Sequence, residues 1–393
     1  MWILVINSGG HTLIEDFVIM NMELHKFSDI QLSDPFFDSL KNDYPGFSDW
    51  YAKKAETGSK ALIQKNELGL LQAFLYLKKE EETITDVNPP MPAAKRLKVG
   101  TFKIDAHNTK LGECFVKKIM QYALYLSFDE IYVTVFPKHA SLIKLLMRFG
   151  FVEYGTKGEG SEPEKVFVKS MKKQVGDVLL DYPFVHSKDT RKFVLAIKPE
   201  YHTILFPDSI LNTESRNKDV LVKDVSHTNS IHKIYLASMK GLEQLKRGDI
   251  LLIYRTGDGA GPAKYRSVIS SVCVVEEIKT AKDFASIDEY LKYVEPYSIF
   301  PDAELKTWFV RNSMVVIKMT YNVAFNRRVT RNELIQEVGL ESEYWGFFQI
   351  TDEQFKDIIE RGQVDYRNFN HKYKRIDKKL IDERFKNKPL KLS

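Results

Sequence analysis

A strand, a short polar turn and a helix follow one another directly in the first half of the chain. Residues 97–105, LKVGTFKID, alternate in character as a β-strand does, and apolar residues recur at helical spacing over 111–127. A second apolar strand, EIYVTVF, follows at 130–136. Strands connected through crossover helices are typical of the α/β class, so this arrangement constrains the fold more than any other feature of the sequence.

The elements on either side of this unit extend the same pattern. The sequence predicts a helical segment at 35–56, a hairpin at 60–66 and 67–79, a helix at 140–150 and paired strands at 151–156 and 165–170. The charged, Pro-rich segment 80–96 is interpreted as an insertion. Together these elements predict an α/β sandwich of about 150 residues.

The second half is richer in strands. Six are predicted, at 191–197, 202–207, 233–238, 248–256, 265–278 and 313–325. Two helices carry capping boxes, TRNE at Thr330–Glu333 and TDEQ at Thr351–Gln354. Many short strands with few helices predict a mostly β domain, a closed or nearly closed barrel with helical decoration.

The 393 residues are too many for one ordinary core, so we expect two domains. The predicted order is an extension at 1–27, an α/β domain at 28–172, a linker at 173–189, the β-rich domain at 190–352, and a helix with a basic tail at 353–393. Met20 and Met22 are alternative starts, and two interpretations of residues 1–21 stay open: an extra strand, or a segment that precedes the true start.

Charge and cysteine content limit the function classes. The net charge is +5, but residues 371–393 carry nine Lys/Arg against three Asp/Glu, so the basic excess belongs to the tail. The tail is interpreted as a solvated helix or as a contact for nucleic acid. The two cysteines, Cys114 and Cys273, predict buried, reduced thiols and a cytoplasmic protein. No run is long enough to span a membrane, and no signal-peptide pattern is recognised.

The turn before the helix has the chemistry of an anion site. The first helical turn presents backbone N–H groups without internal partners, and the helix dipole adds partial positive charge there. Gly112 permits close backbone approach, Lys110 adds a cation, and His107 and Asn108 can donate from the rim. This pattern predicts a diphosphate site. An ordinary turn between strand and helix is the alternative.

The order of elements over residues 28–172, ending in LLMRFGFVEYG, resembles the GNAT (Gcn5-related) N-acetyltransferase family. The resemblance implies that the strands 97–105 and 130–136 splay apart, and that the first, through Phe102 and Ile104, pairs with the pantetheine arm of acetyl-CoA. It also implies a pyrophosphate cradle, with RFGF at 148–151 ending the second motif. The residues implied in cofactor binding are Phe102, Ile104, His107, Asn108, Thr109, Lys110, Leu111, Gly112, Glu113 and His139.

Two positions depart from the pattern of that family. Of the turn Arg/Gln-x-x-Gly-x-Gly/Ala only the last glycine, Gly112, is kept, and Lys110 takes the fourth position. The family's usual tyrosine, which returns a proton to the leaving thiolate, corresponds to Leu146, and its usual asparagine to His139. A thiolate whose pKa is near 8.5 still leaves readily at pH 7, so Leu146 is compatible with slow or lost activity as well as with full activity.

A base for the attacking amine is expected among the carboxylates near this site. Asp105, at the end of the splayed strand, is the first candidate, and Glu153 is the second. For either residue an ordinary surface carboxylate is the alternative, since positioning of the amine alone supplies much of the rate.

The segment LKRGDILLIYRTGDGAGPAKYRSVISSVCVVEEI resembles the PUA-like superfamily, its ASCH branch in particular, over residues 190–352. The resemblance implies binding of RNA or modified nucleic acid. Aromatic and cationic residues that could stack a base and hold its phosphate are Tyr254, Arg255, Lys264, Tyr265 and Arg266, with 198–203 as a second rim. Packed rings and solvated cations are the alternative.

The histidines of this half, His202, His227 and His232, lack a Cys or carboxylate partner at ligand spacing, which argues against a metal.

The two resemblances together predict an acetyl-CoA-dependent N-acetyltransferase whose second domain brings it to RNA, tRNA or a ribonucleoprotein. The acceptor amine is left open. The alternative is a nucleic-acid-binding or sensing protein with a CoA-binding but weakly active GNAT domain, and a third interpretation makes the barrel a packing element.

Overall fold

The computed structural model describes residues 23–66, 68–105, 110–159, 162–209, 230–311 and 313–369. They divide into two compact units: a first unit that ends at Glu81 and resumes over Leu97–Asn108, and a second unit of Glu82–Arg96 and the chain from Thr109 onward. The structure is of the α/β class. The predictions for residues 1–22 and for the tail beyond 369 lie outside the described residues.

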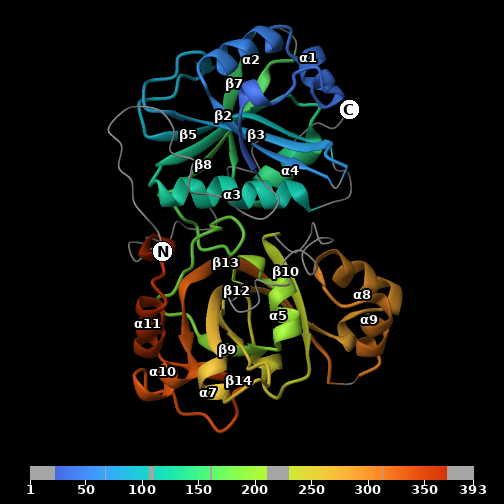
Figure 1. Cartoon of the computed structure of the whole chain (residues 1–393), viewed down its shortest axis with the longest axis vertical. Coiled ribbons are helices and arrows are strands. Elements are labelled where there is room, and N and C mark those ends of the chain that lie inside the picture. The colour runs from blue at the N-terminus through green and yellow to red at the C-terminus, as the bar shows by residue number, and fades with distance from the viewer. Residues whose placement is uncertain are drawn as a thin grey trace. The chain divides into compact units, whose positions relative to one another are not determined.

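The first unit combines short helices, of which α1 and α2 are labelled in Figure 1, with strands in the order β1-β2-β3-β5. Its elements are β1 (Glu23–Lys26), η1 (Phe27–Asp29), η2 (Pro35–Phe37), α1 (Asp38–Asp43), α2 (Phe47–Glu56), β2 (Lys60–Lys65), β3 (Leu71–Glu80) and β5 (Arg96–Ile104). The predicted helical segment, hairpin and strand are therefore confirmed. β1 pairs with β2, so part of the predicted extension belongs to this unit.

An aromatic core holds the helices of this unit to its strands. Phe27 is fully buried and its ring lies 5.4 Å from Phe74 of β3 and 4.9 Å from Tyr51 of α2, centroid to centroid. The Tyr51 hydroxyl donates to the carbonyls of Phe27 (3.2 Å) and Ile30 (2.9 Å). The polar end of the ring is thereby satisfied inside the apolar cluster.

The second unit begins with the remaining α/β elements that the sequence predicted. They are α3 (Leu111–Tyr125), β6 (Glu130–Val135), α4 (Ala140–Arg148), β7 (Val152–Lys157) and β8 (Glu164–Ser170), and the short strand β4 (Val87–Asn88), which the sequence does not predict, joins them. The strands run in the order β6-β8-β7-β4. Within the predicted insertion 80–96, β4 pairs with β7.

The segment predicted as a linker packs into the second unit. Tyr182 is fully buried and donates its hydroxyl to the carbonyl of Tyr321, 2.9 Å away. Lys169 of β8 donates to the carbonyls of Phe149 (2.7 Å) and Leu180 (2.8 Å), and its burial lowers its pKa to about 7.

Gly150, which follows α4, makes this close packing possible. Its φ is +81°, and a Cβ there would lie 2.1 Å from the Leu180 carbonyl oxygen. Only glycine fits, because it tolerates positive φ and leaves that space empty.

A six-stranded mixed sheet with surrounding helices forms the rest of the second unit. Its strands are β9 (Lys192–Ile197), β10 (His232–Ala237), β11 (Ile250–Arg255), β12 (Val268–Thr280), β13 (Val315–Thr330) and β14 (Phe347–Ile350), in the order β10-β13-β12-β11-β9-β14. The helices are α5 (Pro199–Leu205), α7 (Ala263–Arg266), α8 (Ile287–Val294), α9 (Asp302–Phe309), α10 (Arg331–Gln336) and α11 (Asp352–Arg361). Short 3₁₀ turns are η3 (Pro207–Ser209), η5 (Leu242–Gln244), η6 (Ala281–Asp283), η7 (Glu295–Tyr297) and η8 (Tyr366–Asn368).

The prediction of a closed barrel is not supported. Among the described strands, β10 and β14 are the two edges of the order and no pairing joins them. The physical reason is that both faces of the sheet are covered. Leu251 and Ile253 of β11 face one buried cluster, whereas Ile250 and Leu252 face the other.

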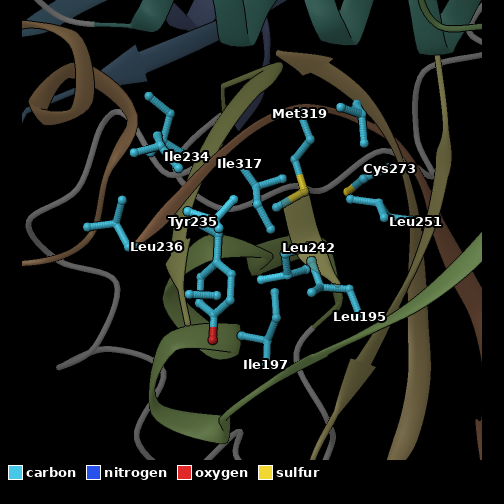
Figure 2. Close-up of a cluster of buried hydrophobic side chains, with 14 of the residues drawn as sticks. Leu195, Ile197, Ile234, Tyr235, Leu236, Leu242, Leu251, Cys273, Ile317 and Met319 are labelled. Atoms are coloured by element: carbon cyan, nitrogen blue, oxygen red, sulfur yellow. The ribbon is translucent and has the colours of Figure 1, made fainter. Parts of the chain in front are cut away.

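The first cluster, part of which is drawn in Figure 2, includes residues of α5, α8 and α9, and the second includes residues of α10 and α11. Each fully buried Leu or Ile contributes roughly 1.5–3 kcal/mol, so the helices stabilise an open sheet as closure would.

Local sequence signals predict the starts of α10 and α11 correctly, but one predicted strand is a helix. Thr330 and Thr351 each accept from the third residue of the following helix, which confirms both capping boxes. The predicted strand at 202–207 is wrong, because those residues largely belong to α5. Pro199 stands at the first helical position, where its fixed φ favours a helix despite the β-branched residues that follow.

Candidate cofactor-binding helix and its polar network

Helix α3 begins at the place where the sequence predicts a diphosphate site. Lys110 is its N-cap and supplies no side-chain cap. Leu111 is buried, while Lys110 and Gly112 are half-buried. The predicted rim residues His107, Asn108 and Thr109 lie outside the described residues. Lys110 and Gly112 are therefore the described residues of the cradle that a ligand can approach.

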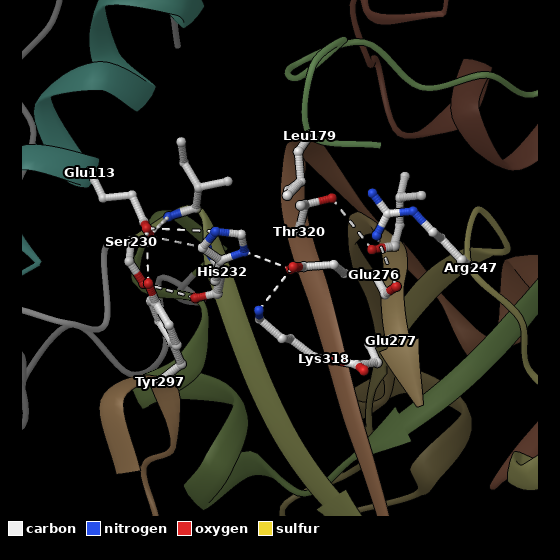
Figure 3. A network of polar contacts seen from close by, with 12 residues as sticks. Glu113, Leu179, Ser230, His232, Arg247, Glu276, Glu277, Tyr297, Lys318 and Thr320 are labelled. Carbon is white, nitrogen blue, oxygen red and sulfur yellow. Dashed lines mark hydrogen bonds and ion pairs between the residues drawn. The ribbon is translucent and has the colours of Figure 1, made fainter. Parts of the chain in front are cut away.

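Glu113, at the third helical position, accepts hydrogen bonds from residues that are far away in the sequence. Its side chain is 4% exposed, and one carboxylate oxygen accepts from the backbone N–H of Ile231 (3.0 Å) and of His232 (3.3 Å). The other oxygen accepts from the Tyr297 hydroxyl, 3.1 Å away (Figure 3). Three donors offset the cost of burying the charge. The prediction that Glu113 contributes to the pyrophosphate cradle can therefore apply only to its backbone amide, because its carboxylate is already hydrogen-bonded.

His232 continues this network onto the six-stranded sheet (Figure 3). Its Nε2 lies 3.7 Å from Glu113, and its Nδ1 lies 2.7 Å from Glu276 of β12. Lys318 of β13 donates to the other oxygen of Glu276 at 2.8 Å. Burial alone would raise the pKa of Glu276, but the contacts with His232 and Lys318 outweigh it and lower the pKa to about 2.

A second charged cluster lies further along the same helix. Lys117 of α3 is fully buried and donates to Asp208, 2.8 Å away, and its Nζ lies 4.2 Å from the centre of the Tyr321 ring. Lys118 lies 3.8 Å from the same carboxylate. Burial lowers the pKa of Lys118 to about 8. Burial would raise the pKa of Asp208, but Lys117 and Lys118 hold it well below its usual range.

The expected pantetheine strand and first base belong to the first unit. Phe102 and Ile104 of β5 are half-buried. Asp105, directly after β5, is exposed and lies 3.4 Å from Lys103.

The remaining GNAT-type positions belong to the second unit. Glu153 is exposed on β7 and accepts from Lys165 at 3.0 Å. His139 is the N-cap of α4, and Leu146 is buried within that helix. The structure therefore gives Leu146 no role in proton transfer.

The residues predicted to bind nucleic acid divide into buried and exposed sets. Tyr254 is 1% exposed and packs on Trp345, with ring centroids 5.4 Å apart. Arg255 is 2% exposed and donates to the Thr256 carbonyl at 3.2 Å. A base cannot stack on a buried ring, so Tyr254 is a core residue.

The other three residues lie on or next to the surface. Lys264 and Tyr265 of α7 are exposed, with the Lys264 Nζ 4.8 Å from the Tyr265 ring centre, and Arg266 is paired with Asp258. In the second rim, His202 and Thr203 are buried within α5.

The sequence did not reveal the contacts that connect α3 to the six-stranded sheet, although it drew attention to Glu113 and His232 for other roles. Tyr297, His232 and Asp208 carry no local motif, because their roles depend on contacts far apart in the chain. A partial signal exists at Lys117 and Lys118, which interrupt an otherwise apolar helical run and are buried. Lysines are rarely buried without a partner, so such an interruption indicates a distant carboxylate.

Both cysteines are buried and form no disulfide, as the sequence predicts. Within the described ranges no helix has the length and apolar character to cross a membrane. No group of three or more His, Cys, Asp or Glu side chains in that part of the chain could hold a metal ion.

No protein-family model matches the chain, and no curated protein matches it. Among solved structures it is similar to the ASCH protein from Zymomonas mobilis, with 8% identity over 44% of this chain and 96% of that chain and a TM-score of 0.30. It is also similar to a putative phosphinothricin N-acetyltransferase (16% identity, 38% of this chain, 98% of that chain, TM-score 0.28). A third is spermidine N-acetyltransferase from Vibrio cholerae in complex with CoA and spermine (12%, 38%, 94%, TM-score 0.25). These identities and TM-scores are low and do not indicate a function.

Proposed function

We propose that this protein is an acetyl-CoA-dependent N-acetyltransferase. The observation that carries the proposal is the start of α3, where Lys110 and Gly112 stand half-exposed in the first helical turn. The backbone amides of a first helical turn, the helix dipole and a lysine favour a diphosphate such as that of coenzyme A. The predicted order of helix, hairpin, strand, helix, strand, helix and strand pair, which is present throughout residues 35–170, supports the same function.

The reaction would join an amine to the acetyl carbon. The amine nitrogen attacks the thioester carbonyl carbon, the C–S bond breaks, CoA leaves as a thiolate, and the amine loses one proton. Asp105 and Glu153 remain the proposed acceptors of that proton. Glu153 already accepts from Lys165, so it would have to exchange this partner to act as a base. Leu146 donates no proton, and water would protonate the thiolate.

Titration calorimetry with acetyl-CoA, followed by an assay of thiol release over a panel of amines, tests this function. We expect binding with one site per chain and release of free thiol with at least one amine. Binding without release on any amine would favour the alternative, a protein that senses CoA. No binding at all would refute the proposal.

The second candidate function is contact with RNA through α7. Lys264 and Tyr265 are exposed side by side, and an aromatic ring beside a cation can stack a base and contact its phosphate. This would bring the acetyltransferase to an amine on RNA, on aminoacyl-tRNA or on a ribonucleoprotein. The proposed RNA contact therefore consists of Lys264 and Tyr265, whereas the sequence predicted a contact that also included Tyr254, Arg255 and Arg266.

Retention of single-stranded RNA in increasing salt measures this contact. We expect wild-type retention to fall as salt rises, because phosphate contacts release counterions. The double variant Lys264→Ala, Tyr265→Ala should retain less RNA at every salt concentration. A control variant, Lys356→Ala, removes an exposed lysine from α11 and should behave as wild type. Retention that is independent of salt would exclude the phosphate contact.

A further inference from the structure

Hydrogen bonds that the sequence did not predict hold the first turn of α3 to residues on and near the six-stranded sheet. Glu113 receives the backbone amides of Ile231 and His232 and the hydroxyl of Tyr297. The Lys110 Nζ lies 4.4 Å from the centre of the Tyr297 ring. One tyrosine therefore contacts both charged side chains of this turn.

These contacts change the charge that the helix start presents. A carboxylate at the third helical position would repel a diphosphate bound at the same turn. In the structure the Glu113 carboxylate accepts instead from three donors far away in the sequence, and its side chain is nearly excluded from solvent. Lys110 is held against an aromatic face, which attracts a cation without neutralising it. The charge of Lys110 is therefore not neutralised by Tyr297, whereas hydrogen bonds compensate the buried charge of Glu113.

Tyr297 is itself held in place from two sides. It ends the short turn η7, directly after α8. Its ring meets the His232 ring edge-on, with centroids 5.1 Å apart, and His232 pairs in turn with Glu276, which Lys318 also contacts. The position of Tyr297 thus depends on β10, β12 and β13.

We infer that Tyr297 is a positioning residue for the cofactor turn, through which the six-stranded sheet fixes Glu113 and Lys110 at the start of α3. The inference rests on the proposed function for its consequence in cofactor affinity, whereas the fastening of the turn is a property of the free protein. The six-stranded sheet would then contribute to CoA binding, independently of any contact with nucleic acid.

Two substitutions separate the hydroxyl from the ring. Tyr297→Phe removes the donor to Glu113 and keeps the aromatic face under Lys110, whereas Tyr297→Leu removes both. Tyr293→Phe is the matched control, because Tyr293 is also half-buried and donates to a carboxylate, that of Glu277, at 2.6 Å, but has no described contact with α3.

Amide hydrogen exchange of residues 111–116, measured by mass spectrometry on the full chain without ligand, reports the fastening. We expect exchange to become about 10-fold faster in Tyr297→Phe and faster still in Tyr297→Leu, because a buried carboxylate loses a charged hydrogen bond. The control Tyr293→Phe should match wild type over these residues. Exchange that is unchanged in Tyr297→Leu would overturn the inference.

Calorimetry with CoA gives the second readout on the same variants. We expect CoA affinity to fall about threefold in Tyr297→Phe and about 10-fold or more in Tyr297→Leu, while Tyr293→Phe keeps the wild-type value. Faster exchange with unchanged affinity would overturn the role in cofactor binding. If wild type itself fails to bind CoA, the proposed function fails, and the exchange experiment still decides whether Tyr297 fastens the turn.

Discussion

The double variant Lys110→Glu, Gly112→Leu should lose measurable affinity for CoA. Charge reversal at Lys110 removes an attraction and adds a repulsion, and a leucine side chain prevents a phosphate from approaching the backbone at Gly112. A hydrogen bond to a charged group contributes roughly 1.5–3 kcal/mol, so two such losses correspond to about 100-fold or more in the dissociation constant. Titration calorimetry at constant salt measures the change.

The control for this prediction is Lys356→Glu, which makes the same charge reversal at an exposed position of α11. It should leave CoA affinity within about twofold of wild type, because solvent and salt screen distant exposed charges. The thermal midpoint of the double variant should stay close to that of wild type, since both replaced positions are half-buried at a helix start. Wild-type affinity in the double variant would show that CoA binds elsewhere or that the helix start is not its diphosphate site.

The substitution Asp208→Asn should lower the free energy of unfolding by about 3 kcal/mol. Lys117 is fully buried, and replacement of the Asp208 carboxylate by an amide leaves this buried cation with a weaker partner. Lys118 and Lys233 lose the same favourable charge, and the pKa values of both lysines are already lowered by burial, to about 8 and about 7. Urea unfolding of the full chain measures the difference.

Two further variants test this explanation. Asp38→Asn breaks an ion pair with Lys41 on exposed α1 and should cost less than about 1 kcal/mol, because exposed pairs contribute little. The double variant Lys117→Met, Asp208→Leu removes both charges and should recover part of the lost stability. If Asp208→Asn and Asp38→Asn cost the same, the buried cluster is not a stabilising element.

Acid titration gives an independent check with a definite sign. The pKa of Asp208 is lower in the folded protein than in the unfolded chain, so its contribution is complete above the ordinary carboxyl range, near pH 4. It is lost as pH falls below that range. The stability of wild type should therefore fall more steeply between about pH 4 and pH 2 than that of Asp208→Asn.

Much of the fold follows from local sequence signals, whereas the site network does not. The strand at 97–105 and the helix beginning at Leu111 are marked by periodicity, and both capping boxes mark helix starts directly. Even a misassigned element has a local explanation, since Pro199 starts a helix where β-branched residues favour a strand.

The contacts that decide the chemistry are made by residues far apart in the chain. Glu113 reads as part of a turn in the sequence, but Ile231 and Tyr297, more than 100 positions away, determine where its carboxylate points. The distinction between a barrel and a covered sheet has the same origin. The run at 250–255 is apolar on both faces, and the sequence alone does not specify which helices cover each face.

The burial of the segment 173–189 has a consequence for dividing this polypeptide. A fragment that ends near residue 172, the end of the first domain that the sequence predicts, would carry Glu113, Lys117 and Lys118 without the hydrogen-bond donors and the carboxylate that contact them. It would also lack the backbone oxygen of Leu180 that receives the ammonium of Lys169. Residues 28–172 are consequently not expected to fold stably without the rest of the polypeptide, so the proposed activity should be assayed in the intact chain.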